Sequence, residues 1–114
     1  MQPEVTVAHL ERMEAVRTAA VARRAEALRG SLPAAAALLR SQGADGVWVF
    51  GSLVAGDVHR LSDVDLAVRG LPDEVYFRTL SHLVALFDAE VDLVQLEGAS
   101  PSLRAHIETE GRPL

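Results

Sequence analysis

A glycine–serine pair and two aspartates stand close together in the segment that runs from residue 47 to residue 68. Ten residues separate Ser52 from Asp63, and Asp65 follows two positions later. Glycine lets a backbone approach a ligand closely, and the first N–H groups of a helix attract phosphate oxygens, so Gly51 and Ser52 suit a phosphate-binding turn. Side chains alternate along a strand, so Asp63 and Asp65 are predicted to present both carboxylates on one face.

A third carboxylate, Asp92, lies at the second position of the predicted strand from residue 91 to residue 96. If that strand pairs beside the strand of Asp65, three carboxylates meet, and their mutual repulsion favours a bound divalent cation. Hard oxygen ligands suit Mg²⁺, which is completed by waters and substrate phosphates. Two such ions can activate an attacking oxygen and stabilise the leaving oxygen at phosphorus, with Asp92 as general base. The residues therefore predict phosphoryl or nucleotidyl transfer.

Helices and short strands alternate along the chain and must position these residues. Apolar periodicity and helix-end signals predict four helices, over residues 4–29, 33–43, 72–88 and 101–111. Short β-branched runs predict three strands, over residues 47–50, 63–68 and 91–96. We expect an α/β (α+β) domain whose small mixed sheet carries the three aspartates on one face and packs helices on the other.

Composition excludes several other classes of function. The 114 residues carry a net charge of −5, which argues against nucleic acid as a main partner. Without cysteine or lysine, the chain cannot use a disulfide framework, a zinc–thiolate site, or a cysteine or lysine nucleophile. Neither a secretory signal nor an apolar run of about 18 residues is found. We expect a single-domain cytoplasmic protein that does not enter a membrane.

The phrase GSLVAGDVHRLSDVD resembles the signature of the DNA polymerase β-type nucleotidyltransferase superfamily. The size of the chain, SDVDLAV and the later VDLV are similar to its minimal nucleotidyltransferases, the MNT group, over about residues 43–111. The resemblance implies a polymerase β-like nucleotidyltransferase fold, ATP as substrate and Mg²⁺ as cofactor. It also implies that the nucleotide is bound by Gly51, Ser52 and Ser62. The catalytic carboxylates that bind the metal would be Asp63, Asp65 and Asp92.

The resemblance further implies a partner and a reaction. Minimal members often act as antitoxins of a HEPN-domain RNase toxin, and they transfer AMP from ATP to a tyrosine hydroxyl of that toxin. Many relatives carry arginine after Gly-Ser, where this chain has Leu53–Ala55, and Arg60 and Arg69 are nearby bases that could compensate. Two alternatives stay open: a catalytically weak nucleotide-binding module that neutralises a toxin by direct binding, and a nucleotide- or metal-binding regulator without transfer.

The first 30 residues fall outside the signature and are expected to form a helical extension before a nucleotidyltransferase domain at residues 31–114. Five of the eleven arginines lie on this extension, opposite an apolar seam: Arg12, Arg17, Arg23, Arg24 and Arg29. Such a helix packs on its own domain or forms a surface for a second copy or a toxin, and the sequence favours neither.

Overall fold

The structure is a computed structural model that describes residues 6–55 and 62–114. Its centre is a four-stranded mixed sheet with the strand order β3-β2-β1-β4. Antiparallel pairing joins β1 to β2 and to β4, and parallel pairing joins β2 to β3. The strands are β1 (Gly46–Phe50), β2 (Val64–Arg69), β3 (Val91–Gln95) and β4 (Arg112–Pro113). The predicted mixed sheet is confirmed, with β4 as an unpredicted fourth strand at its edge.

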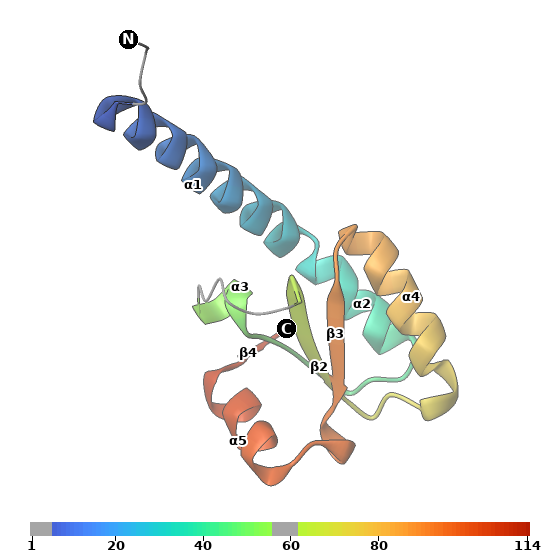
Figure 1. Cartoon of the computed structure of the whole chain (residues 1–114). Coiled ribbons are helices and arrows are strands. Elements are labelled where there is room, and N and C mark those ends of the chain that lie inside the picture. Colours follow the sequence, from blue (N-terminus) through green and yellow to red (C-terminus); the bar gives the residue numbers. More distant parts are fainter. Residues whose placement is uncertain (1–5, 56–61) are drawn as a thin grey trace.

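Helices cover both faces of this sheet (Figure 1). Side chains of β2 such as Leu66 pack with α2 and α4 in the larger core cluster, while Ile107 of α5 packs against Phe50 and Ala67 on the opposite face. The sequence had placed helices on the first face only, so the cover by α5 is an addition to the expected architecture. The helices are α1 (Val7–Gly30), α2 (Leu32–Ser41), α3 (Ser52–Ala55), α4 (Tyr76–Phe87) and α5 (Pro101–Glu110), with 3₁₀ turns η1 (Asp73–Val75) and η2 (Leu96–Gly98).

Local sequence signals fix several of these helix ends. The hydroxyl of Thr6 accepts a hydrogen bond from the His9 N–H and begins α1, and Ser100 accepts from the Leu103 N–H and begins α5. Asp88 adopts a left-handed conformation, with φ of 50°, and ends α4 just before β3. The turn after α4 therefore delivers the chain directly to the start of β3, where Asp92 lies.

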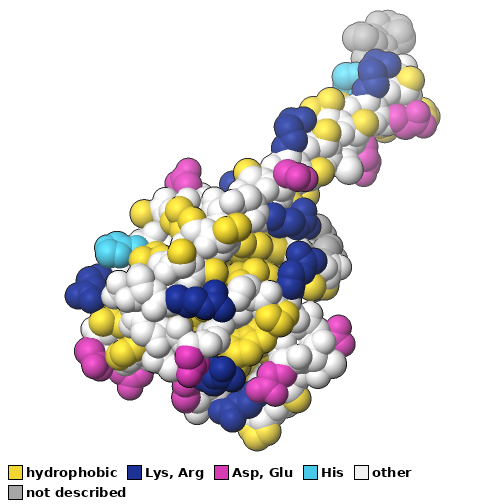
Figure 2. All heavy atoms as spheres, turned by 180° about the vertical axis from the view of Figure 1, so that it is seen from behind, with side chains coloured by type: hydrophobic (Ala, Val, Ile, Leu, Met, Phe, Trp, Pro, Cys, Tyr) yellow, Lys and Arg dark blue, Asp and Glu magenta, His cyan; other side chains and the backbone are white. Residues whose placement is uncertain are grey.

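Helix α1 projects from the rest of the molecule (Figure 1), and the whole molecule is 65 Å in its longest dimension. Among the described residues of α1, only Leu28 is buried. Apolar side chains alternate with charged ones along the projecting part (Figure 2), and its large exposed hydrophobic residues are Val7, Leu10, Met13, Val16 and Val21. Within the described residues, no helix is long and apolar enough to cross a membrane. The helix predicted over residues 4–29 is thus present in the described part, and most of it does not pack on its own domain.

Candidate functional site

Asp65 lies on the central strand and is almost completely buried, with 1% of its surface exposed. Its neighbours Val64 and Leu66 point into the core beneath α2 and α4, so alternation turns Asp65 to the opposite face of the sheet. The hydroxyl of Ser62 donates a hydrogen bond to Asp65 Oδ1 at 2.5 Å. A buried carboxylate needs such donors, because desolvation would otherwise penalise its charge. Ser62, which we expected to bind nucleotide, therefore holds a carboxylate in this structure.

The turn after β1 packs directly against this carboxylate. Phe50 and Asp65 are register partners on the antiparallel strands β1 and β2, so Gly51 follows at the same end of the sheet. Gly51 has a φ of 73°, in the left-handed region, and a Cβ atom at this position would lie 2.9 Å from Asp65 Cγ. Ser52 then begins α3. The predicted glycine turn and the predicted carboxylate are thus in contact, and only glycine permits that contact.

Asp92 is the register partner of Asp65 on the parallel strand β3. Neighbouring strands are about 4.8 Å apart, and register partners present their side chains to the same face. Val91 and Leu93, on either side of Asp92, are buried in the core, whereas Asp92 is exposed. The structure therefore places the two carboxylates beside each other, as the sequence led us to expect, and adds that one is buried and the other exposed.

The charge of Asp92 also affects the pKa of Tyr76, a residue of α4. The hydroxyl of Tyr76, in the first turn of α4, donates to the Leu93 carbonyl oxygen at 2.5 Å. Burial of the phenol raises the pKa of Tyr76 above its usual value of 10.0, and the nearby Asp92 carboxylate raises it further. Tyr76 thus ties α4 to the strand that carries Asp92.

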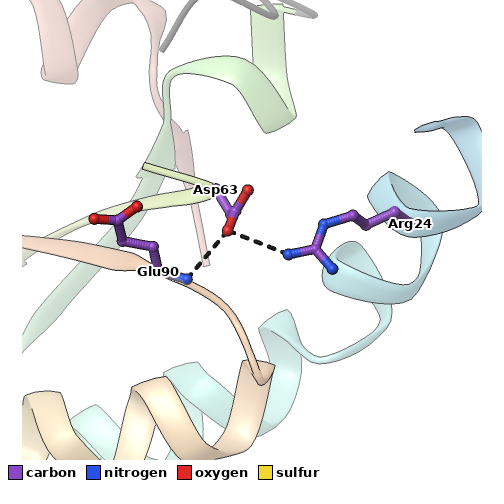
Figure 3. Close-up of polar contacts among 3 residues, drawn as sticks. All are labelled: Arg24, Asp63 and Glu90. Carbon is purple, nitrogen blue, oxygen red and sulfur yellow. Dashed lines mark hydrogen bonds and ion pairs between the residues drawn. The ribbon is translucent and has the colours of Figure 1, made fainter. Parts of the chain in front are cut away.

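Asp63 does not join this pair in the way we expected. The strand predicted over residues 63–68 begins at Val64, and Asp63 lies in a bend before it. Its Oδ2 accepts a hydrogen bond from the Glu90 N–H at 3.1 Å and pairs with the guanidinium of Arg24, on α1, at 3.2 Å (Figure 3). Because Asp63 is outside the strand, alternation does not align it with Asp65, and its carboxylate is held by α1 and the chain before β3.

The donor set suits a hard divalent cation, although the arrangement is not a complete cage. Among the described residues, no group of three or more His, Asp or Glu side chains is arranged to hold a metal ion. Mg²⁺ is commonly bound by one or two carboxylates together with waters and substrate phosphates. Asp65 and Asp92 fit this pattern, whereas the Oδ2 of Asp63 is engaged with Arg24 and with the Glu90 N–H.

Two arginines of α1 were not predicted to belong to the site. Arg24 pairs with Asp63, and the Nε of Arg29 donates to the carbonyl oxygen of Leu53 in α3 at 3.2 Å. Both lie outside the signature that drew attention to the aspartates, and nothing in the spacing of the arginines distinguished them. Their proximity to the site depends on how α1 meets the domain, which the sequence pattern does not encode.

Of the two bases suggested as substitutes for a loop arginine, the structure describes Arg69, and its ion pair is with Asp45 rather than with a carboxylate of the site. Arg69 ends β2, four residues from Asp65, and its Nε donates to Asp45 Oδ1 at 2.8 Å, a contact that raises the pKa of Arg69. Arg60 lies outside the described residues. In the described part of the chain, the base that forms an ion pair with Asp63 is Arg24 of α1.

Comparison with known proteins agrees with this geometry. Residues 35–114 match the family described as Polymerase beta, Nucleotidyltransferase. The protein adenylyltransferase MntA of Shewanella oneidensis is 35% identical over 71 residues, which are 60% of this chain and 51% of MntA. The chain thus spans about half the length of this curated relative.

Two solved structures are also similar. One is of a protein provisionally described as a minimal nucleotidyltransferase, with 33% identity, a TM-score of 0.68, and coverage of 79% of this chain and 95% of that one. The other is of a tri-AMPylated S. oneidensis HEPN toxin in complex with an MNT antitoxin, with 25% identity, a TM-score of 0.60, and coverage of 75% and 70%. With its sheet, its glycine turn and its paired aspartates, this chain belongs to the polymerase β nucleotidyltransferase family.

Proposed function

We propose that this protein transfers AMP from ATP to a hydroxyl group of a partner protein and acts as the antitoxin of a HEPN-domain toxin. The observation that carries the proposal is the contact of the Gly51 turn with Asp65, directly beside Asp92. It combines a backbone turn suited to phosphate with two carboxylates suited to Mg²⁺, in a chain of this family. A cytoplasmic location, where ATP is abundant, is part of the proposal.

In the proposed reaction, Gly51 and Ser52 hold the phosphates of ATP, and Asp65 and Asp92, with Asp63, hold Mg²⁺. When bound, Mg²⁺ neutralises phosphate charge and makes the α-phosphorus more electrophilic. The acceptor hydroxyl loses its proton to Asp92, which is the exposed member of the pair, while its oxygen bonds to the α-phosphorus. The bond from that phosphorus to the bridging oxygen breaks, and pyrophosphate leaves.

The partner is proposed from the relatives. S. oneidensis MntA is a protein adenylyltransferase, and the similar solved complex pairs an MNT antitoxin with a tri-AMPylated HEPN toxin. The fixed position of Asp92 at an exposed sheet edge is compatible with an acceptor side chain, such as a tyrosine, that arrives from another protein. We therefore propose a tyrosine of a HEPN toxin as the acceptor.

Labelled ATP tests this function. The purified protein is incubated with Mg²⁺, a lysate of its source and ATP labelled at either the α- or the γ-phosphate. We expect label from the α-phosphate alone on one protein band, and no label with Asp65→Asn. Asp45→Asn is the matched control, because it removes an exposed carboxylate paired with Arg69, at the other end of β2. Transfer from the γ-phosphate, or equal transfer by Asp65→Asn, would contradict the proposal.

A second candidate is a catalytically weak module that neutralises a toxin by binding it. It is favoured by the pairing of Asp63 with Arg24, which leaves no group of three carboxylates among the described residues. The variant Asp63→Asn/Asp65→Asn separates the two: a toxin still fully neutralised by this variant is neutralised by binding, and a toxin released from inhibition requires catalysis.

The extension formed by residues 1–30 is proposed as part of the partner-binding surface, either for the toxin or for a second copy. Its support is the set of exposed apolar side chains on α1 between Val7 and Val21. A chain that begins at residue 22 keeps Arg24 and Leu28, and we expect it to label its acceptor less efficiently or to change its oligomeric state. Unchanged labelling and an unchanged elution volume would exclude this role.

A further inference from the structure

We propose that Arg24 is a phosphate-positioning residue of the nucleotide site. It neutralises Asp63 while no metal is bound, and it turns to the phosphates of the nucleotide when Mg²⁺ takes Asp63. The proposal rests on the proposed function, because it assumes that Asp63 is a metal ligand and that a nucleoside triphosphate is the substrate.

The position of Arg24 is set by packing. Leu28 lies one helical turn after Arg24, on the same side of α1, and it is buried in the main core cluster. Arg29 adds a second connection through the Leu53 carbonyl oxygen of α3. These two contacts fix the last turns of α1 against the site, so the guanidinium of Arg24 is brought to Asp63 by the fold.

The ion pair between Arg24 and Asp63 is well suited to replacement of the guanidinium by a metal ion. Asp63 Oδ2 already accepts from the Glu90 N–H, so a cation that binds this oxygen must compete with the guanidinium for the remaining space. A divalent ion would also repel the guanidinium at this distance. The side chain of Arg24 is 55% exposed, so it can rotate away without leaving a cavity in the core.

The phosphates of a metal-bound nucleotide are then the natural new partner. Guanidinium groups bind phosphate oxygens through paired, charge-assisted hydrogen bonds. The segment that follows the glycine turn, Ser52–Ala55, contains no cationic side chain, so it cannot provide this interaction itself. Within the described part of the chain, Arg24 is the base that contacts a predicted metal ligand. Helix α1 would therefore supply a charge that α3 lacks.

Two binding measurements on the same variants test the exchange. Binding of Mn²⁺ alone is followed by electron paramagnetic resonance, and binding of AMP-PNP with Mg²⁺ by calorimetry. In Arg24→Ala we expect Mn²⁺ to bind about threefold more tightly, because an exposed ion pair is weak. We expect the nucleotide to bind about tenfold more weakly, because one charged phosphate contact is lost. The two affinities thus change in opposite directions, which a loss of structure would not produce.

Two further variants complete the test. Arg23→Ala, on the same helix but about 100° around it, removes equal charge and should leave both affinities unchanged. Arg24→Lys keeps the charge and should restore nucleotide binding to within about threefold of wild type, since a lysine can contact phosphate as a point charge. These variants also remain informative if Arg24→Ala is unstable.

The outcomes separate the two proposals. If the wild-type protein binds the nucleotide and Arg24→Ala binds it with the same affinity, the role of Arg24 is overturned and the proposed function stays intact. A parallel loss of both affinities in Arg24→Ala, without rescue by lysine, also overturns it, because Arg24 is then structural. Failure of the wild-type protein to bind AMP-PNP with Mg²⁺ overturns the proposed function itself, and the inference with it.

Discussion

Two aspartates separated by one residue occupy different surroundings. Asp65 is 1% exposed, bonded to Ser62 and covered by the Gly51 turn, all within the sheet and its connections. Asp63 lies outside β2, and its side chain is 40% exposed and paired with Arg24 of α1. The contacts of Asp65 described above thus come from the region that matches the family, residues 35–114, whereas the surroundings of Asp63 also depend on a helix that begins before the match.

The largest effect on AMP transfer is expected at Asp65. Asp65→Asn should lower transfer of AMP by at least about a thousandfold, because a neutral amide neither binds Mg²⁺ well nor stabilises its charge. The amide keeps the shape of the side chain and an oxygen that can accept from Ser62, so the melting temperature should stay equal or rise. Labelling kinetics and thermal unfolding measure the two effects. A large loss of stability would mean that the buried charge is needed for folding.

Gly51→Ala tests how closely the turn and Asp65 are joined. A methyl group there meets the Asp65 carboxylate, and alanine is strained at a φ of 73°. We expect a loss of about 2 to 4 kcal/mol in the free energy of unfolding, from the backbone and the contact together. Gly98→Ala is the control, since a Cβ there meets nothing within 4 Å, and it should change stability by less than about 0.5 kcal/mol. Equal denaturation midpoints for the two variants would contradict the close contact.

Tyr76→Phe examines the strand that carries Asp92. At neutral pH the variant should be about 1 kcal/mol less stable, because the hydrogen bond to Leu93 is lost. The folded protein raises the pKa of Tyr76, so above pH 10 the unfolded chain loses this proton first and the wild-type protein becomes less stable as the pH rises.

In this chain the effect of Tyr76 ionisation on stability can be measured without interference from other side chains. Tyr76 is its single tyrosine, and it contains neither cysteine nor lysine, so no other side chain titrates between about pH 9 and 11.5. Urea unfolding at pH 8 and pH 11 should therefore show the wild-type protein losing its advantage over Tyr76→Phe. An equal change in the stability of both proteins would contradict the raised pKa.

The smallest effect on stability is expected at Asp63. Asp63→Asn breaks an exposed ion pair with Arg24 and should lower stability by less than about 1 kcal/mol, much like Asp45→Asn, which breaks the exposed pair with Arg69. The two variants should nevertheless differ in labelling, because only Asp63 is a proposed metal ligand. A loss of stability at Asp63 well above that at Asp45 would show that the contact with α1 is structural.

The part of the site that lies on the sheet, with Asp65 and Asp92, was predictable from the sequence because it depends on local sequence patterns. Alternation along residues 64–68 places Asp65 opposite the core, and the matching pattern around Asp92 predicts pairing with it. The resemblance then singled out Gly51 and Ser52, which lie at the same end of the sheet.

The remaining features depend on contacts that leave no local pattern. Arg24 and Asp63 are 39 positions apart, and their meeting requires the angle at which α1 joins the domain. The two residues of β4 are too few to show alternation, and the cover by α5 rests on few apolar residues, namely Ile107 and the partly buried Leu103. The alternation rule failed at Asp63 because the strand begins one residue later than predicted.

Helix α1 also has the proportions of a lever. Taking Leu28 as the pivot, Arg24 lies about 6 Å along the axis and Val7 about 32 Å, at 1.5 Å per residue. A tilt that moves Arg24 by about 1 Å would therefore carry Val7 through about 5 Å. A small tilt of the helix about Leu28 is thereby amplified about fivefold at its far end, whereas rotation of the Arg24 side chain alone leaves that end where it is.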